Sequence, residues 1–126
     1  MLQVTGKKTF CLVLNLKEVI AFYEVIDLEC TFLVEENGYA YMRCDGDAVR
    51  LLEVDTPEAK SAMRQHMVYI DIASADAFWS QHQAFLESLP DSTARAPFDQ
   101  PYLQREVHIY DPGGTILMIG HDIRPR

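Results

Sequence analysis

The chain has 126 residues and carries 19 Asp and Glu against 11 Lys and Arg, for a net charge of −8, with 48% hydrophobic residues. This length fits one compact domain that buries a core without disulfides or a structural metal, and the composition excludes a disordered chain. The acidic balance argues against a nucleic-acid partner and is compatible with a cationic ligand. No apolar run approaches the roughly 20 residues that span a bilayer, so we expect neither a membrane segment nor a targeting segment.

The three cysteines, Cys11, Cys30 and Cys44, are odd in number and lack the C-x-x-C spacing typical of zinc sites. Two of them lie in apolar surroundings, which indicates reduced core thiols. We therefore expect a cytoplasmic protein whose cysteines hold no metal.

The first half of the chain is expected to fold in the order strand, helix, strand, strand, strand. The apolar run 8–14 is typical of a strand, and Asn15 with Glu18 three residues later forms a capping box that begins a helix reaching about residue 27. The Asn37-Gly38 pair predicts a tight hairpin turn, in which it supplies the positive φ angles. The three strands of this half are expected over residues 31–34, 39–44 and 48–54.

The second half repeats that order. Ser74 is expected to cap a helix that runs to residue 89, and the D-P-G-G segment 111–114 predicts a turn between the last two strands. Residues 97–102 are expected to form a loop. The strands of this half are expected over residues 66–72, 91–96, 105–110 and 115–120.

This duplication predicts an α+β protein of two paired βαβββ modules, residues 7–55 and 65–122, within a single domain over residues 1–126. Each module would form a small sheet with one helix on its outer face. Paired side by side, the modules would form a curved mixed sheet around a concave pocket, which is the natural place for a ligand.

Residues 101–114 read PYLQREVHIYDPGG. With the paired βαβββ order, this motif resembles the vicinal-oxygen-chelate superfamily of glyoxalase I, extradiol dioxygenases and bleomycin-resistance proteins. The Q-R-E and D-P-x-G segments match the pattern P-W-G-Q-R-E-F followed by D-P-x-G-N of the bleomycin-resistance branch. The resemblance covers residues 8–121 and implies a homodimer.

Enzymes of this superfamily hold a divalent metal with four side chains, one from each of four strands. The resemblance puts those positions at Lys8, Leu51, His66 and Met118. Only His66 is a suitable ligand, because Lys8 would repel a cation and Leu51 and Met118 offer no hard donor. We therefore expect no metal and no cofactor, and we expect these four side chains to line the ligand pocket.

The resemblance also points to two aromatic residues. Tyr102 stands where the bleomycin-binding relatives carry a loop Trp that stacks on the drug, and Tyr39 stands where they carry a second aromatic ring. With Glu35 and Glu36 nearby, such platforms suit a flat, cationic ligand. The alternative for both tyrosines is an ordinary role in covering apolar surface.

Glu106 and His108 lie two residues apart on one expected strand, so their side chains share a face. They are candidates for polar contacts with a ligand, or for a pair in which Glu106 orients a proton-transferring imidazole. A structural hydrogen bond or salt bridge of Glu106 is the alternative, as is a backbone hydrogen bond for His66.

The sequence thus predicts a metal-free protein that binds a small amphipathic or cationic molecule, as the antibiotic-sequestering bleomycin-resistance proteins do. One alternative is a glyoxalase- or dioxygenase-like lyase or oxygenase with a divalent metal. Another is a metal-free acid–base catalyst using His66, Glu106 or His108, and a third is an interaction protein with a vestigial pocket. No nucleic-acid or membrane partner is expected.

Overall fold

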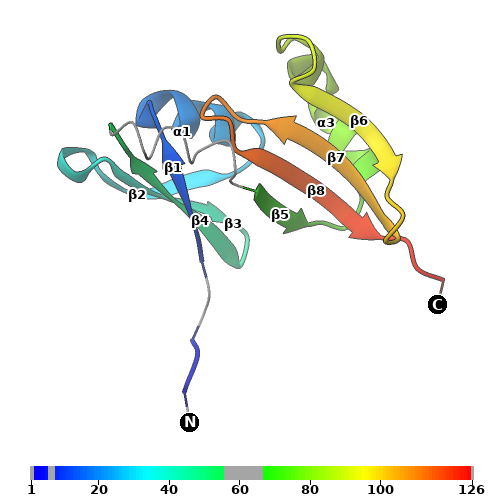
Figure 1. The fold of residues 1–126 in the computed structure, drawn as a ribbon, viewed down its shortest axis with the longest axis horizontal. Coiled ribbons are helices and arrows are strands. Elements are labelled where there is room, and N and C mark those ends of the chain that lie inside the picture. The colour runs from blue at the N-terminus through cyan, green and yellow to red at the C-terminus, as the bar shows by residue number, and fades with distance from the viewer. Residues whose placement is uncertain (1, 6–7, 56–66, 126) are drawn as a thin grey trace. The chain divides into compact units, whose positions relative to one another are not determined.

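The computed structural model describes residues 2–5, 8–55 and 67–125, and the chain divides into two compact units, Met1–Arg64 and Gln65–Arg126 (Figure 1). Within each unit the strands and the helix follow the predicted order of strand, helix and three strands. The expected α+β class with two βαβββ modules is therefore confirmed.

Among its described residues, unit 1 is a four-stranded mixed sheet on which the helix α1 packs. The strand order is β1-β4-β3-β2, in which β1 pairs parallel with β4 and the other pairs are antiparallel. Its elements are β1 (Thr9–Val13), α1 (Leu16–Val25), β2 (Glu29–Val34), the single 3-10 turn η1 (Glu35–Asn37), β3 (Tyr39–Cys44) and β4 (Asp47–Glu53).

Unit 2 repeats this arrangement, with the strand order β5-β8-β7-β6 and a parallel β5–β8 pair. Its helix packs against β6, β7 and β8. Among the described residues no helix is long and apolar enough to cross a membrane. The elements are β5 (Met67–Asp71), α3 (Ala75–Glu87), β6 (Ala94–Asp99), β7 (Gln104–Tyr110) and β8 (Ile116–Asp122).

Both helices begin where the sequence predicts. The Asn15 side-chain oxygen accepts a hydrogen bond from the Glu18 backbone N–H at 3.1 Å, and the Ser74 hydroxyl accepts one from Ala77 at 3.1 Å. These side chains satisfy backbone donors that have no partner inside the helix.

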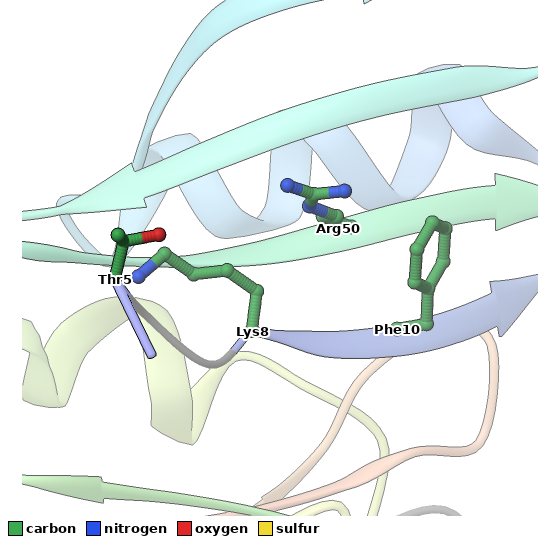
Figure 2. A pocket seen from close by; sticks show the side chains of 4 residues that line it. All are labelled: Thr5, Lys8, Phe10 and Arg50. Carbon is green, nitrogen blue, oxygen red and sulfur yellow. The ribbon is translucent and has the colours of Figure 1, made fainter. Parts of the chain in front are cut away.

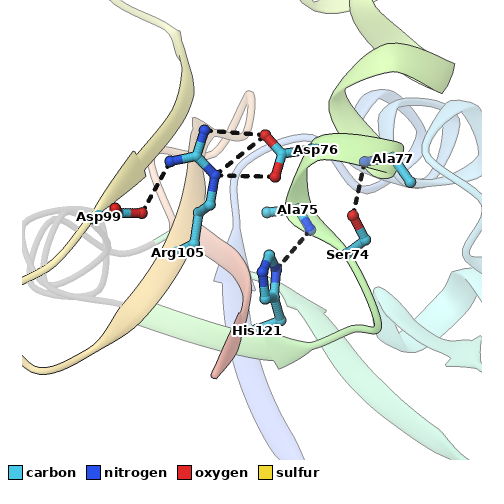
Figure 3. Close-up of polar contacts among 7 residues, drawn as sticks. All are labelled: Ser74, Ala75, Asp76, Ala77, Asp99, Arg105 and His121. Carbon is cyan, nitrogen blue, oxygen red and sulfur yellow. Dashed lines mark hydrogen bonds and ion pairs between the residues drawn. The ribbon is translucent and has the colours of Figure 1, made fainter. Parts of the chain in front are cut away.

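The sheet of unit 2 holds the first turn of α3 in place (Figure 3). The Ala75 backbone N–H donates to Nδ1 of His121 at 2.9 Å, so the proton of neutral His121 is on Nε2. Arg105 on β7 donates to Asp76 at 3.0 Å and to Asp99 at 2.9 Å. Hydrogen bonds to these two carboxylates raise the pKa of Arg105. The arginine of the Q-R-E motif therefore ties helix to sheet.

The predicted loop over residues 97–102 is wrong in its first half, because β6 continues to Asp99. Pro97 does not end the strand, since β6 is an edge strand and its register with β7 shifts between Arg95 and Phe98. Proline, which lacks a backbone donor, is tolerated at such edges and irregularities.

The turn after β2 also differs from the prediction. Gly38 has a positive φ of 64°, whereas Asn37 is not among the residues with positive φ and belongs to η1. A 3-10 turn of three residues replaces the two-residue turn, so a single left-handed residue is sufficient to reverse the chain.

Replacing Asn15 by Ala should lower the free energy of unfolding by about 1 kcal/mol, because the Glu18 N–H loses its acceptor. Asn15→Asp keeps an acceptor and should stay within about 0.5 kcal/mol of the wild type. Urea denaturation followed by circular dichroism measures both. An equal loss in the two variants would show that the cap does not stabilise α1.

Candidate functional site

Each sheet has one face that packs on α1 or α3 and an opposite face, against which no helix of the described residues packs, that we call the helix-free face. Because side chains alternate along a strand, the register assigns each residue to one face. In unit 1 the helix-free face carries Lys8, Phe10, Tyr39, Tyr41 and Arg50. In unit 2 it carries Tyr69, Glu106, His108 and Met118.

Aromatic rings dominate the helix-free face of unit 1. The ring centres of Phe10 and Tyr39 are 6.1 Å apart, and those of Phe32 and Tyr39 are 6.3 Å apart. The guanidinium carbon of Arg50 lies 5.8 Å from the Phe10 ring centre and 5.7 Å from that of Tyr41. Arg50 is thus held by two aromatic rings at cation–π distance.

A depression of about 360 Å³ opens on this face, lined by Thr5, Lys8, Phe10 and Arg50 (Figure 2). Lys8 Nζ lies 3.4 Å from the Asp47 carboxylate. The backbone N–H of Ala48 and the Lys8 ammonium lower the pKa of Asp47. The two cations and the exposed Phe10 ring give this depression a positive and partly apolar lining.

A second hollow, of about 330 Å³, lies at the start of α1 and includes Leu33, Glu35 and Gly38 in its lining. The Leu16 backbone N–H at this helix start donates to Glu53 at 2.8 Å. Since a carboxylate already accepts from the first turn, the helix end is satisfied without a ligand.

Leu51 requires a correction, because the sequence predicts it as a residue lining the pocket with Lys8. Its side chain is 0% exposed, and it pairs with Cys11 and Ala40 on the face that packs on α1. The residue from β4 on the helix-free face is its neighbour Arg50, since alternation turns adjacent side chains to opposite faces.

Unit 2 carries a polar cluster centred on Glu106, whose side chain is 0% exposed. One carboxylate oxygen accepts from the Tyr102 hydroxyl at 2.7 Å. The other accepts from the Gln100 amide at 3.0 Å and lies 2.7 Å from Nε2 of His108. Because an ionised carboxylate only accepts hydrogen bonds, His108 must carry a proton on Nε2.

Burial raises the pKa of Glu106, but hydrogen bonds, chiefly from His108, Tyr102 and Gln100, outweigh it and hold the pKa below its ordinary value. The carboxylate in turn raises the pKa of Tyr102 through their hydrogen bond. Burial and then the charge of Glu106 raise the pKa of Tyr69. The cluster is therefore an ionised carboxylate among protonated donors.

The prediction that Glu106 and His108 share a face is confirmed by their contact. The edge of Phe98 packs on the His108 ring with centroids 4.8 Å apart, and Met118 pairs with His108 in the register. The structure thus brings Tyr102, Glu106, His108 and Met118 together in unit 2, whereas Lys8 and Tyr39 lie at separate places on the helix-free face of unit 1. His66 lies outside the described residues.

Several polar residues of these faces escaped prediction, namely Arg50, Tyr69, Gln100 and Gln104. The Tyr69 hydroxyl donates to Gln104 at 3.0 Å from a strand that is not adjacent to β7. The alternation of side chains along β4 could have identified Arg50, because it puts Arg50 and its neighbour Leu51 on opposite faces of the sheet. Nothing local marks Tyr69 as a partner of residues 35 positions away.

Within residues 2–5, 8–55 and 67–125, no group of three or more His, Cys, Asp or Glu could hold a metal ion.

Gly120 faces Glu106 across the β7–β8 pair, and a methyl group there would lie 2.5 Å from the Arg105 carbonyl oxygen and 2.7 Å from the Tyr69 hydroxyl. Gly120→Ala should therefore cost about 1–3 kcal/mol of stability. Gly46→Ala is the matched control, because nothing lies within 4 Å of its added methyl group. Thermal and urea unfolding of both variants test this, and similar losses at the two sites would contradict it.

Glu106→Gln should lower the free energy of unfolding by about 1–3 kcal/mol near pH 7, because an amide nitrogen would face hydrogen-bond donors. A lowered folded-state pKa means that the stabilisation is present above the unfolded pKa and is lost as the pH falls. The gap between wild type and variant should thus shrink below about pH 4.3. Urea unfolding from pH 7 to about pH 3.5 measures it.

The exposed Glu36→Gln serves as the control for this experiment and should show no comparable gap at any pH. A gap for Glu106→Gln that is constant with pH would mean that the charge of Glu106 does not stabilise the fold.

No protein-family model and no curated protein matches the sequence of the chain. Solved structures do match. A bleomycin resistance determinant encoded on the transposon Tn5 has a TM-score of 0.75 at 15% identity, over 94% of this chain and 98% of that chain. The bleomycin-binding protein of bleomycin-producing Streptomyces verticillus, complexed with copper(II)-bleomycin, has a TM-score of 0.75 at 14% identity, over 94% and 97% of the two chains.

A lactoylglutathione lyase from Agrobacterium tumefaciens is similar as well, with a TM-score of 0.71 at 17% identity over 94% of each chain. These proteins differ in the functions that their names state, and identities this low show a shared fold. The chain has the paired βαβββ fold that bleomycin-resistance proteins share with glyoxalase relatives, as the residue 101–114 motif predicts.

Proposed function

We propose that the chain binds a small amphipathic molecule with a flat ring, without a metal and without converting it, in the manner of an antibiotic-sequestering protein. The observation that carries this proposal is the depression on the helix-free face of unit 1, where the Phe10 ring lies beside Lys8 and Arg50. Sequestration needs no reaction, because binding alone lowers the concentration of free ligand.

The aromatic side chains of unit 1 support this proposal. Phe10 is 48% exposed and lies beside Tyr39 and Arg50, so an apolar ring and a charged group are adjacent. A molecule with a flat apolar part and a polar part would bury the first against the ring and pair the second.

Tyr102 offers a comparable platform in unit 2. Its ring is part of a side chain that is 56% exposed, while its hydroxyl is tethered to Glu106 at 2.7 Å. Fixing a ring before the ligand arrives reduces the conformational entropy that binding would cost. The tether therefore supports the predicted role of Tyr102 as a stacking surface.

Of the two ligand classes predicted from the sequence, the amphipathic one has the better support. Lys8 and Arg50 would repel a cationic ligand from the depression, and both oxygens of Glu106 already accept hydrogen bonds within unit 2. Antibiotic resistance, a homodimer and a cytoplasmic location remain predictions.

Acid–base catalysis is a second candidate, and the 2.7 Å contact between Glu106 and His108 favours it. A carboxylate that holds one ring nitrogen orients the imidazole and fixes which nitrogen faces the ligand. His108 would then exchange a proton with a ligand through Nδ1, whereas Glu106 would act as a positioning residue.

A thermal-shift screen tests the binding proposal on the full chain with cationic glycopeptides and with neutral and charged aromatic metabolites. A ligand at 100 times its dissociation constant should add about 2.7 kcal/mol of stability and raise the melting temperature. Tyr102→Ala or Phe10→Ala should weaken the binding of a hit while the chain stays folded. A panel that shifts nothing would contradict the proposal.

Mass spectrometry of each hit after long incubation with stoichiometric protein separates binding from catalysis. An unchanged ligand supports sequestration. Conversion that is lost in His108→Gln, although the ligand still binds, would replace the proposed function by acid–base catalysis.

A further inference from the structure

Arg50 is the least satisfied charged side chain of the two helix-free faces. Its Nε is buried and has no hydrogen-bond partner, and in the part of the chain that the structure describes its guanidinium forms no ion pair. Its described interactions are the two aromatic contacts, with Phe10 and Tyr41. Burying part of a cation without a counter-charge is unfavourable for stability, and a bound anion beside Arg50 would reduce that cost.

The two rings do not meet that need. An aromatic ring attracts the cation through its electron-rich face but accepts no strong hydrogen bond, and guanidinium carries five N–H donors in one plane. Phe10 and Tyr41 therefore restrain Arg50 and leave the donors of its two terminal amino groups available. A restrained planar fork is suited to a carboxylate or another oxyanion, which it can contact with two parallel hydrogen bonds.

Lys8 adds a second positive charge to the same depression (Figure 2). Its ammonium has three donors, and the Asp47 carboxylate at 3.4 Å engages it from a side chain that is itself 70% exposed. Because the Asp47 partner is exposed to water, which competes for it, this ion pair is weak. Lys8 can thus turn toward an anion held by Arg50 without giving up a strong interaction.

The net charge of the chain opposes the binding of anions in general. A protein with a net charge of −8 does not attract anions through its overall field. An anion that binds here must therefore depend on the short-range contacts of Arg50 and Lys8, and its binding should be sensitive to those two side chains.

We propose that the depression on the helix-free face of unit 1 binds the anionic group of an aromatic oxyanion, with Arg50 and Lys8 on the oxygens and Phe10 against the ring. This inference rests on the proposed binding function and names the class of its ligand. It differs from the sequence-based expectation of a cationic ligand.

Isothermal titration of the full chain with four probes that share a naphthalene ring tests the proposal. The probes are 1-naphthoate, neutral 1-naphthamide and 1-naphthylmethylammonium, with 1-naphthyl phosphate as a second oxyanion. We expect 1-naphthoate or 1-naphthyl phosphate to bind about tenfold more tightly than 1-naphthamide, the effect of one charge-assisted contact. The tighter of the two oxyanions identifies the anionic group.

Arg50→Gln should abolish the preference for the oxyanion. The matched control is Arg43→Gln, because Arg43 lies on the same face of the neighbouring β3 and pairs with exposed Glu29 at 3.2 Å. It removes the same formal charge and should keep the preference. Lys8→Gln provides a second variant at the strand start should Arg50→Gln fail to fold, and it should reduce the oxyanion affinity severalfold.

The inference is overturned if the amide or the ammonium binds as tightly as both oxyanions, or if Arg43→Gln reduces oxyanion binding as much as Arg50→Gln does. If no naphthalene probe binds while another compound of the screening panel raises the melting temperature, the binding function stands and the oxyanion site falls. If neither the probes nor the panel bind, both proposals fall.

Discussion

In the part of the chain that the structure describes, each four-stranded sheet packs on one helix, α1 or α3, which buries one of its two faces. Strand alternation then divides the sequence of every strand between a core set and a helix-free set. On the helix side lie buried residues such as Cys11, Leu51, Val107 and Ile109. The opposite set is under no such packing requirement, and it is there that charged and aromatic side chains collect.

The two units use this freedom in opposite ways. Unit 1 places a cation, Arg50, among aromatic rings and leaves its donors unsatisfied. Unit 2 places an anion, Glu106, among donors that satisfy it. A satisfied buried charge rigidifies its surroundings, whereas an unsatisfied one favours a partner from outside. The same scaffold can therefore supply a fixed framework in one unit and a binding group in the other.

The Q-R-E motif shows how adjacent residues serve the two faces of one strand. Arg105 reaches the first turn of α3 through Asp76, whereas Glu106, one position later, organises Tyr102, Gln100 and His108 on the other face. Gly120 has no side chain, which lets Tyr69 reach this cluster across β8. The contacts of this motif stabilise the fold and do not by themselves define a reaction. Proteins of similar fold include a resistance determinant and a lyase, which agrees with this.

The sequence by itself determined the element order, both helix caps and the fold class, because hydrophobic periodicity and capping act over a few residues. It also determined that Glu106 and His108 share a face, since the period of two is local. The prediction ended β6 too early, because an edge strand tolerates Pro97. The prediction also placed Leu51 in the pocket, whereas the strand register puts its neighbour Arg50 on the helix-free face. Only the tertiary structure decided which charged side chains have hydrogen-bond partners. Strand pairing places Arg50 beside Phe10 and Tyr41, whose rings accept no strong hydrogen bond. The path of the loop before β7 brings Gln100 and Tyr102 to Glu106, and no local sequence pattern encodes either arrangement.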